Sequence, residues 1–94
     1  MRRDSLKPFE FIKTDKGEVI AKGSYIAHES HVYITTKKQE VWDFFRKIQA
    51  KKQQIEYIEF TEYSIYSGPF IISSLSKDNE THKITVFLNR FLNR

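Results

Sequence analysis

The sequence predicts an α+β fold, with one amphipathic helix packed on a face of a five- to six-stranded, mostly antiparallel sheet, in the order β-β-β-α-β-β-β. Residues 35–55 place apolar side chains at helical spacing, whereas the segments on either side are rich in Tyr, Ile, Val, Phe and Thr. Short turn signals separate those segments. A chain of 94 residues is typical of one domain, which we expect to span residues 1–94.

The first part of the chain should contribute three strands. Residues 1–7 begin with basic side chains and are followed by Pro8, which predicts a flexible lead-in. The turn residues Asp-Lys-Gly and the polar stretch His-Glu-Ser-His divide residues 9–34, and Gly23 should bend the strand between them. We therefore expect strands over residues 9–13, 18–26 and 32–34, with turns at 15–17 and 28–31.

One helix should follow the third strand. Thr36 can act as its N-cap, with Gln39 three residues later in the spacing of a capping box. Its apolar side is formed by Val41, Phe44, Phe45 and Ile48. The predicted helix ends near Gln53 or Gln54.

The last part of the chain should return to strands. Residues 55–66 predict one strand, and a bulge near Thr61 or Glu62 would explain a slip in its apolar alternation. Ser67, Gly68 and Pro69 predict a break after it. Residues 70–76 and 81–88 are then expected to pair as an antiparallel hairpin around the turn at 77–80.

Composition excludes several classes of protein. The chain has no cysteine, which rules out disulfides, thiol catalysis and cysteine-ligated zinc. No apolar run approaches the roughly 18 residues of a membrane span, and the N-terminus lacks the apolar core of a signal peptide. These features predict a cytoplasmic protein without a membrane partner. A net charge of +4 moderately favours anionic partners.

A strip on the predicted helix is the first candidate contact site. Trp42 lies about 120° from the centre of the apolar side, so it should fall outside the sheet contact. Trp and Arg are enriched at binding hot spots. The strip comprises Trp42, Arg46, Gln49 and Gln53. The alternative is that Trp42 sits at the border of the sheet contact, with its ring under a strand end.

The C-terminus offers a second contact. Residues 87–90, Phe-Leu-Asn-Arg, are repeated at once as residues 91–94. Phe91 and Leu92 could anchor a partner protein or a second copy of the chain in a homodimer. The alternative is ordinary closure of the core followed by a frayed end.

The helix cations support a different partner, nucleic acid. The candidate phosphate contacts are Lys37, Lys38, Arg46, Lys47, Lys51 and Lys52. Exposed sheet tyrosines could stack on bases beside them: Tyr25, Tyr33, Tyr57, Tyr63 and Tyr66. The alternative is a solvated helix face, and the interleaved Glu40 and Asp43 weaken the attraction for phosphate.

Catalytic and metal signals are weak. His28 and His31 share a turn, but zinc requires three or four ligands, and these would have to come from distant segments. Glu56, Glu59 and Glu62 do not converge on one side of a regular strand, which is poor geometry for acid–base catalysis. We therefore expect no catalytic residues, no metal and no cofactor.

The sequence as a whole predicts a small non-enzymatic binding module, most simply a protein-binding adaptor or regulator. Its Lys-, Ile-, Glu- and Tyr-rich composition also suits a phage or mobile-element accessory protein. The alternative is a nucleic-acid-binding module that uses the basic helix face. A small RNase or nuclease acting through His28, His31 or His82 is the third hypothesis.

Overall fold

The structure, a computed structural model, describes residues 6–90. In this range it contains β1 (Lys7–Phe9), β2 (Ile12–Thr14), β3 (Gly17–Val19), β4 (Gly23–Ala27), β5 (His31–Thr36), α1 (Gln39–Ala50), β6 (Ile55–Thr61), β7 (Ser64–Lys77) and β8 (Ile84–Arg90). The predicted α+β class, with one helix and an antiparallel sheet, is confirmed. The prediction of five to six strands in the order β-β-β-α-β-β-β is wrong, because the sheet has eight strands and five of them precede the helix.

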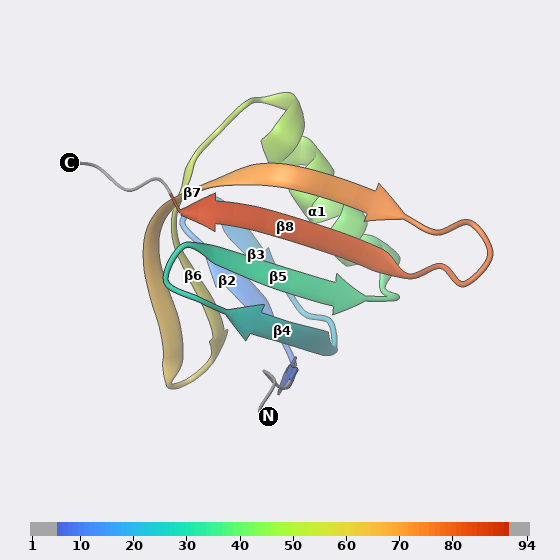
Figure 1. Ribbon diagram of the computed structural model, residues 1–94, viewed down its shortest axis with the longest axis horizontal. Helices are drawn as coiled ribbons and strands as arrows, with labels where there is room; N and C mark the ends of the chain where they lie inside the picture. Colours follow the sequence, from blue (N-terminus) through green and yellow to red (C-terminus); the bar gives the residue numbers. More distant parts are fainter. Residues whose placement is uncertain (1–5, 91–94) are drawn as a thin grey trace.

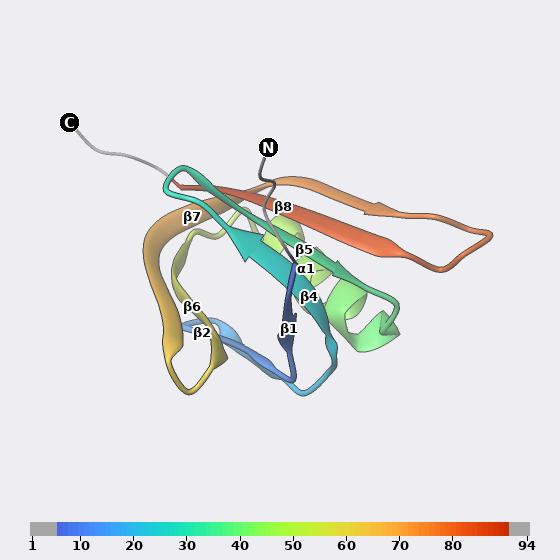
Figure 2. The same cartoon turned by 60° about the horizontal axis from the view of Figure 1, so that its bottom comes forward.

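The eight strands form one antiparallel sheet in the order β1-β4-β5-β8-β7-β6-β2-β3. The sheet is strongly curled, so that β4, β5 and β8 face β6 and β2 across the interior (Figures 1 and 2). β7 connects the two sides, because its first part pairs with β6 and its last part pairs with β8. α1 lies against β3 and β7 and covers the side of the core that the sheet leaves open.

Two predicted N-terminal strands are each divided in the structure. The chain turns at Glu10 and Phe11, so β1 joins β4 near one end of the strand order and β2 joins β6 near the other. It leaves the sheet again at residues 20–22, between β3 and β4. A Cβ on Gly23 would lie 2.6 Å from both a Phe9 ring carbon and the Thr35 carbonyl oxygen. Gly23 therefore permits close packing at the start of β4.

The helix is shorter than predicted and begins without a capping box. Lys38, and not the predicted Thr36, is the N-cap residue, and its side chain has no acceptor with which to cap the helix. The Thr36 hydroxyl lies two residues earlier, where it donates to the Lys22 carbonyl at 2.7 Å and accepts from the Lys38 N–H at 3.2 Å. Helical geometry ends at Ala50, and Lys52 has a positive φ of 55°. The amphipathic prediction for the helix agrees with its burial, since Val41, Phe45 and Ile48 are buried and Phe44 is partly buried against the core.

The segment 55–66 forms a hairpin and not one strand, and the β6–β7 register shifts between Glu59 and Thr61, next to the predicted bulge. β6 ends at Thr61 and β7 begins at Ser64, with Glu62 and Tyr63 as a two-residue turn. This reversal explains the slip in apolar alternation. The predicted break at residues 67–69 is also absent, since β7 continues through the cis Gly68–Pro69 peptide. The predicted antiparallel pairing of the last two strands is confirmed as β7 with β8.

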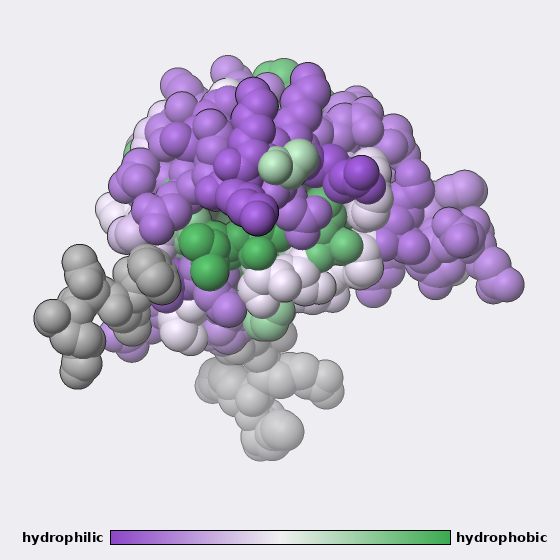
Figure 3. Space-filling view, turned by 90° about the horizontal axis from the view of Figure 1, so that it is seen from above, coloured by the Kyte–Doolittle hydropathy of each residue, from purple (hydrophilic) through white to green (hydrophobic). Residues whose placement is uncertain are grey.

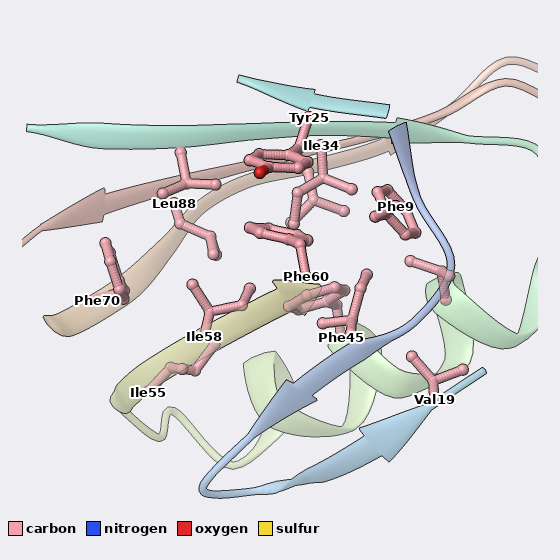
Figure 4. Close-up of a cluster of buried hydrophobic side chains, with 14 of the residues drawn as sticks. Phe9, Val19, Tyr25, Ile34, Phe45, Ile55, Ile58, Phe60, Phe70 and Leu88 are labelled. Carbon is pink, nitrogen blue, oxygen red and sulfur yellow. The ribbon is translucent and has the colours of Figure 1, made fainter. Parts of the chain in front are cut away.

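The core lies between the two sides of the curled sheet, with α1 closing it (Figure 4). Tyr25 on β4 stacks on Phe60 on β6, with ring centroids 3.9 Å apart and an interplanar angle of 10°. These strands are not neighbours in the sheet, so the contact holds its two sides together. Phe9 packs beside both rings. Burial of this aromatic area supplies a large share of the stability of so small a domain.

Candidate functional site

The candidate site is the groove between α1 and the last part of β7. Pairing of β6 with β7 stops at Phe70, so among the described strands only β8 pairs with residues 71–77. α1 runs beside this open edge in the opposite direction. Gln39 at its start contacts Lys77, and Gln49 near its end lines a pocket with Ile71. The 12-residue helix spans about 18 Å.

Trp42 lies at the first end of this groove. Its side chain is half-buried and packs against the core, while the Arg46 guanidinium carbon and the Lys77 Nζ lie 5.6 Å and 5.3 Å from the ring centroid. Lys77 is held there by a 2.6 Å hydrogen bond to the Gln39 side-chain oxygen, and Gln39 donates to Asp43. The indole therefore borders the sheet contact, as in the alternative considered for it, and it also reaches the surface beside two cations.

The second end of the groove is a shallow pocket of about 340 Å³. It is lined by Gln49, Lys52 and Gln53 from the helix side and by Ile71 and Ile72 from β7. Ile71 is 36% exposed. Figure 3 shows apolar side chains exposed between the hydrophilic surface of the helix side and paler residues below them. The predicted strip thus lies beside the apolar side chains of Ile71 and Ile72 on β7, which form the apolar floor of the groove.

The helix cations around this groove lack carboxylate partners. Arg46, Lys47, Lys51 and Lys52 are exposed, and the ion pair found among residues 6–90 joins Asp15 to Lys16 instead. Lys37 and Lys38 are exposed as well, but they precede the helix and lie at its other end. Arg46 lies against Trp42 and Lys52 lines the pocket, so the groove has two helix cations without an ion pair in the described part of the chain. Lys47 and Lys51 line a separate hollow with residues 16–18, on the β3 side of the helix.

Of the strip residues, Trp42 and Arg46 are in contact, and Gln49 and Gln53 share the pocket. Phe91 and Leu92 lie outside the described residues. Sequence reasoning missed Ile71, Ile72 and Lys77, because residues 70–76 have the composition of an ordinary hairpin strand. What distinguishes these residues is that no described strand pairs with them on the side away from β8. The composition of a strand does not show whether its neighbour in the sheet extends along its full length.

The tyrosines considered for base stacking are not all exposed. Tyr25 is 1% exposed and Tyr66 packs against the core, whereas Tyr63 is 91% exposed at the β6–β7 turn. Tyr25 and Tyr66 meet at 6.1 Å between ring centroids. Burial, and then the neighbouring Tyr25 phenol, raise the pKa of Tyr66 above its ordinary value.

A second surface covers the outer face of β5 and β8. The positions that alternate with the buried residues are His31, Tyr33, Thr35, Thr85, Phe87 and Asn89, and none has a formal charge when histidine is neutral. Phe87 contacts the rings of His31 and Tyr33 at 5.0 Å and 6.4 Å between centroids. Such composition is typical of interface cores. The two strands are paired on both sides, so this face offers no open edge.

The third surface considered is a hollow of about 480 Å³ between the β1–β2 connection and the β6–β7 turn. Phe11, Phe60 and Tyr63 give it an apolar lining, and Glu10 and Glu62 are acidic. This hollow is separate from the groove beside α1, and it has acidic side chains where that groove has basic ones.

The histidines and glutamates do not gather into a site. The rings of His28 and His31 lie 4.6 Å apart, but residues 6–90 contain no group of three His, Cys, Asp or Glu side chains that could hold a metal ion. His82 lies in the β7–β8 connection, away from that pair. In the described chain, no helix is both long enough and apolar enough to cross a membrane.

Comparison with known proteins identifies no relative: no protein-family model, curated protein or solved structure matches this chain. The geometry of the surfaces described above therefore supplies the argument for function.

Proposed function

We propose that this protein is a small protein-binding module whose partner docks in the groove between α1 and the open edge of β7. One observation supports this most strongly: the groove combines exposed apolar side chains, a half-buried indole and unneutralised cations. Ile71 and Trp42 supply the apolar contacts, and Arg46 and Lys52 supply the charge. Aromatic and Arg side chains around an apolar centre are features of binding hot spots.

The groove can be tested by selecting random displayed peptides that bind the full chain. Trp42 is the one tryptophan in the sequence, so its fluorescence reports binding directly. We expect the selected peptides to contain apolar and acidic residues. Arg46→Glu and Lys52→Glu should each weaken their binding by about tenfold, because a charge contact becomes a repulsion.

Lys7→Glu is the matched control for these variants. Lys7 is exposed on the edge strand β1, away from α1, and its replacement changes the net charge by the same amount. The control should leave peptide affinity nearly unchanged. Equal affinities for the groove variants and the control would show that the peptides bind elsewhere, and the proposed function would then be wrong.

The unneutralised cations also favour a second candidate function, nucleic-acid binding. Phosphate contacts by Arg46, Lys47, Lys51 and Lys52 would make the affinity for a single-stranded oligonucleotide fall steeply with salt. Protein binding is preferred because β7 adds an apolar floor that phosphates cannot use. A steep loss of oligonucleotide affinity between about 50 and 200 mM salt, together with failure to select any peptide, would reverse this preference.

A further inference from the structure

We infer that the groove takes an extended, acidic segment of the partner, which adds to the sheet as an extra strand beside β7. This inference rests on the proposed function, and it specifies how the partner binds and with what chemistry. Strand addition uses the backbone hydrogen-bonding groups of an exposed sheet edge for affinity, and side-chain contacts for selectivity.

The edge of β7 is well suited to this role. Residues 71–77 pair with β8 on one side, with a register shift between Ile72 and Ser74, and with no described strand on the other. Seven residues of strand extend over about 20 Å, a length close to that of the adjacent helix. Every backbone N–H and C=O that points away from β8 along this stretch needs another partner, such as water or an added strand.

The two terminal strands of the sheet are less suitable. β1 and β3 have three residues each, and Pro8 in the middle of β1 has no N–H to donate. Short strands and proline are features that protect sheet edges from pairing with other chains. β7 therefore offers the longest unpaired stretch in the described strands, and it lies in the groove beside the indole.

Charge selects the chemistry of the added segment. Arg46 and Lys52 lie on the helix side of the groove without ion pairs in the described part of the chain, and Lys77 lies at its first end beside Trp42. Alternate side chains of an added strand would point toward this cationic wall, because side chains alternate across a strand. Acidic residues at those positions, with β-branched residues between them, would complement the groove.

The test uses a capped eight-residue peptide that alternates Glu and Val, titrated into the full chain with Trp42 fluorescence as the readout. A Lys-Val peptide of the same length controls for charge. Two further versions have N-methyl groups on the Glu amides or on the Val amides. In a strand, successive N–H groups point to opposite sides, so only one set faces β7.

We expect the Glu-Val peptide to bind and the Lys-Val peptide to bind at least about tenfold more weakly. One N-methylated version should lose about tenfold or more in affinity, because its hydrogen bonds to β7 are removed, while the other should bind nearly as well as the parent. Hydrogen exchange should also slow at residues 71–77 in the complex.

The alternatives give different results. Equal affinities for the two N-methylated versions would overturn strand addition, while groove variants that still weaken display-selected peptides would leave the proposed function standing. Failure of the Glu-Val peptide to bind would overturn the acidic, extended chemistry. Binding of an oligodeoxythymidylate that is weakened by Lys52→Glu, without binding of the peptide, would assign the groove to nucleic acid.

Discussion

Trp42 shows how one residue connects the core to the proposed groove. Its indole packs against the core on one side and lies beside Arg46 and Lys77 on the other. Removing it should therefore affect both stability and binding, and the two effects have to be measured separately.

Trp42→Ala should lower the free energy of unfolding by about 1–2 kcal/mol, less than the loss at a fully buried aromatic because the indole is half-exposed. Trp42→Phe, which keeps an aromatic ring, should recover most of that loss. Urea unfolding followed by circular dichroism measures both variants. An unchanged stability for Trp42→Ala would show that the indole makes no useful core contact.

Gly23→Ala should be among the most destabilising single substitutions in the chain. The added methyl would lie 2.6 Å from a backbone oxygen that cannot move without disturbing β5. We expect a loss of about 3 kcal/mol or more in unfolding free energy. Lys22→Ala, at the exposed neighbouring position, is the control and should have little effect. Similar stabilities for the two variants would mean that β4 can shift to accept a side chain.

At the scale of elements, α1 begins without a side-chain cap, because Lys38 occupies the N-cap position. Lys38→Asp should raise the free energy of unfolding by about 1 kcal/mol, because the new carboxylate can accept hydrogen bonds from the free N–H groups of the first turn. Lys37→Asp makes the same charge change one residue earlier. Thermal unfolding should show the larger gain for Lys38→Asp, and equal gains would assign the effect to charge alone.

The turn between β2 and β3 is tied to β6 through Asp15. Burial raises the pKa of Asp15, but the hydrogen bond from the Glu56 N–H at 2.8 Å and the nearby Lys16 lower it more, so that the pKa lies below its ordinary value. A carboxylate with a lowered pKa stabilises the folded state at neutral pH. This contribution disappears as the pH falls through the range in which the carboxylate becomes protonated.

The wild-type protein should therefore lose more stability than Asp15→Asn when the pH falls from about 5 to about 2. Asparagine keeps an acceptor oxygen but has no charge to titrate. The difference at pH 5, roughly 1 kcal/mol in favour of the wild type, should shrink in acid. Urea titrations at several pH values measure it. A constant difference across this range would show that the Asp15 charge does not contribute.

The elements differ in how far local sequence predicts them. The amphipathic helix and the β7–β8 hairpin follow from local patterns, which is why Val41, Phe45 and Ile48 are buried as predicted. The β6–β7 turn at Glu62 and Tyr63 lacks the Asn and Gly residues that usually mark a two-residue hairpin, so its local pattern indicates a bulge instead. The division of the N-terminal strands depends on which distant strands they join, and no local pattern encodes that choice.

The sequence predicts the candidate site only on its helix side. Trp42, Arg46, Gln49 and Gln53 follow from the helical period, and the structure places all four along the groove. The floor formed by Ile71 and Ile72 depends on β6 ending its pairing at Phe70, which is a property of the whole sheet. The spacing of apolar residues along a strand does not show whether another strand pairs with its edge.

At the scale of the whole molecule, charge and apolar surface overlap in the groove. The net charge is +4, and Arg46 and Lys52 beside the groove contribute to it without ion pairs in the described part of the chain. Binding of an acidic peptide should therefore weaken with salt but persist at high salt, because the apolar contacts are not screened. Complete loss of peptide binding at about 0.5 M salt would indicate purely electrostatic attraction.

The proposed function depends most on where the partner binds. Backbone amide chemical shifts of the full chain, recorded with and without a display-selected peptide, test it most directly. We predict that the largest changes fall at residues 71–77 of β7 and residues 46–53 beside them, with little change at Tyr33 and Phe87 on the outer face. Changes centred on that outer face, or on the hollow beside Tyr63, would contradict the proposed groove.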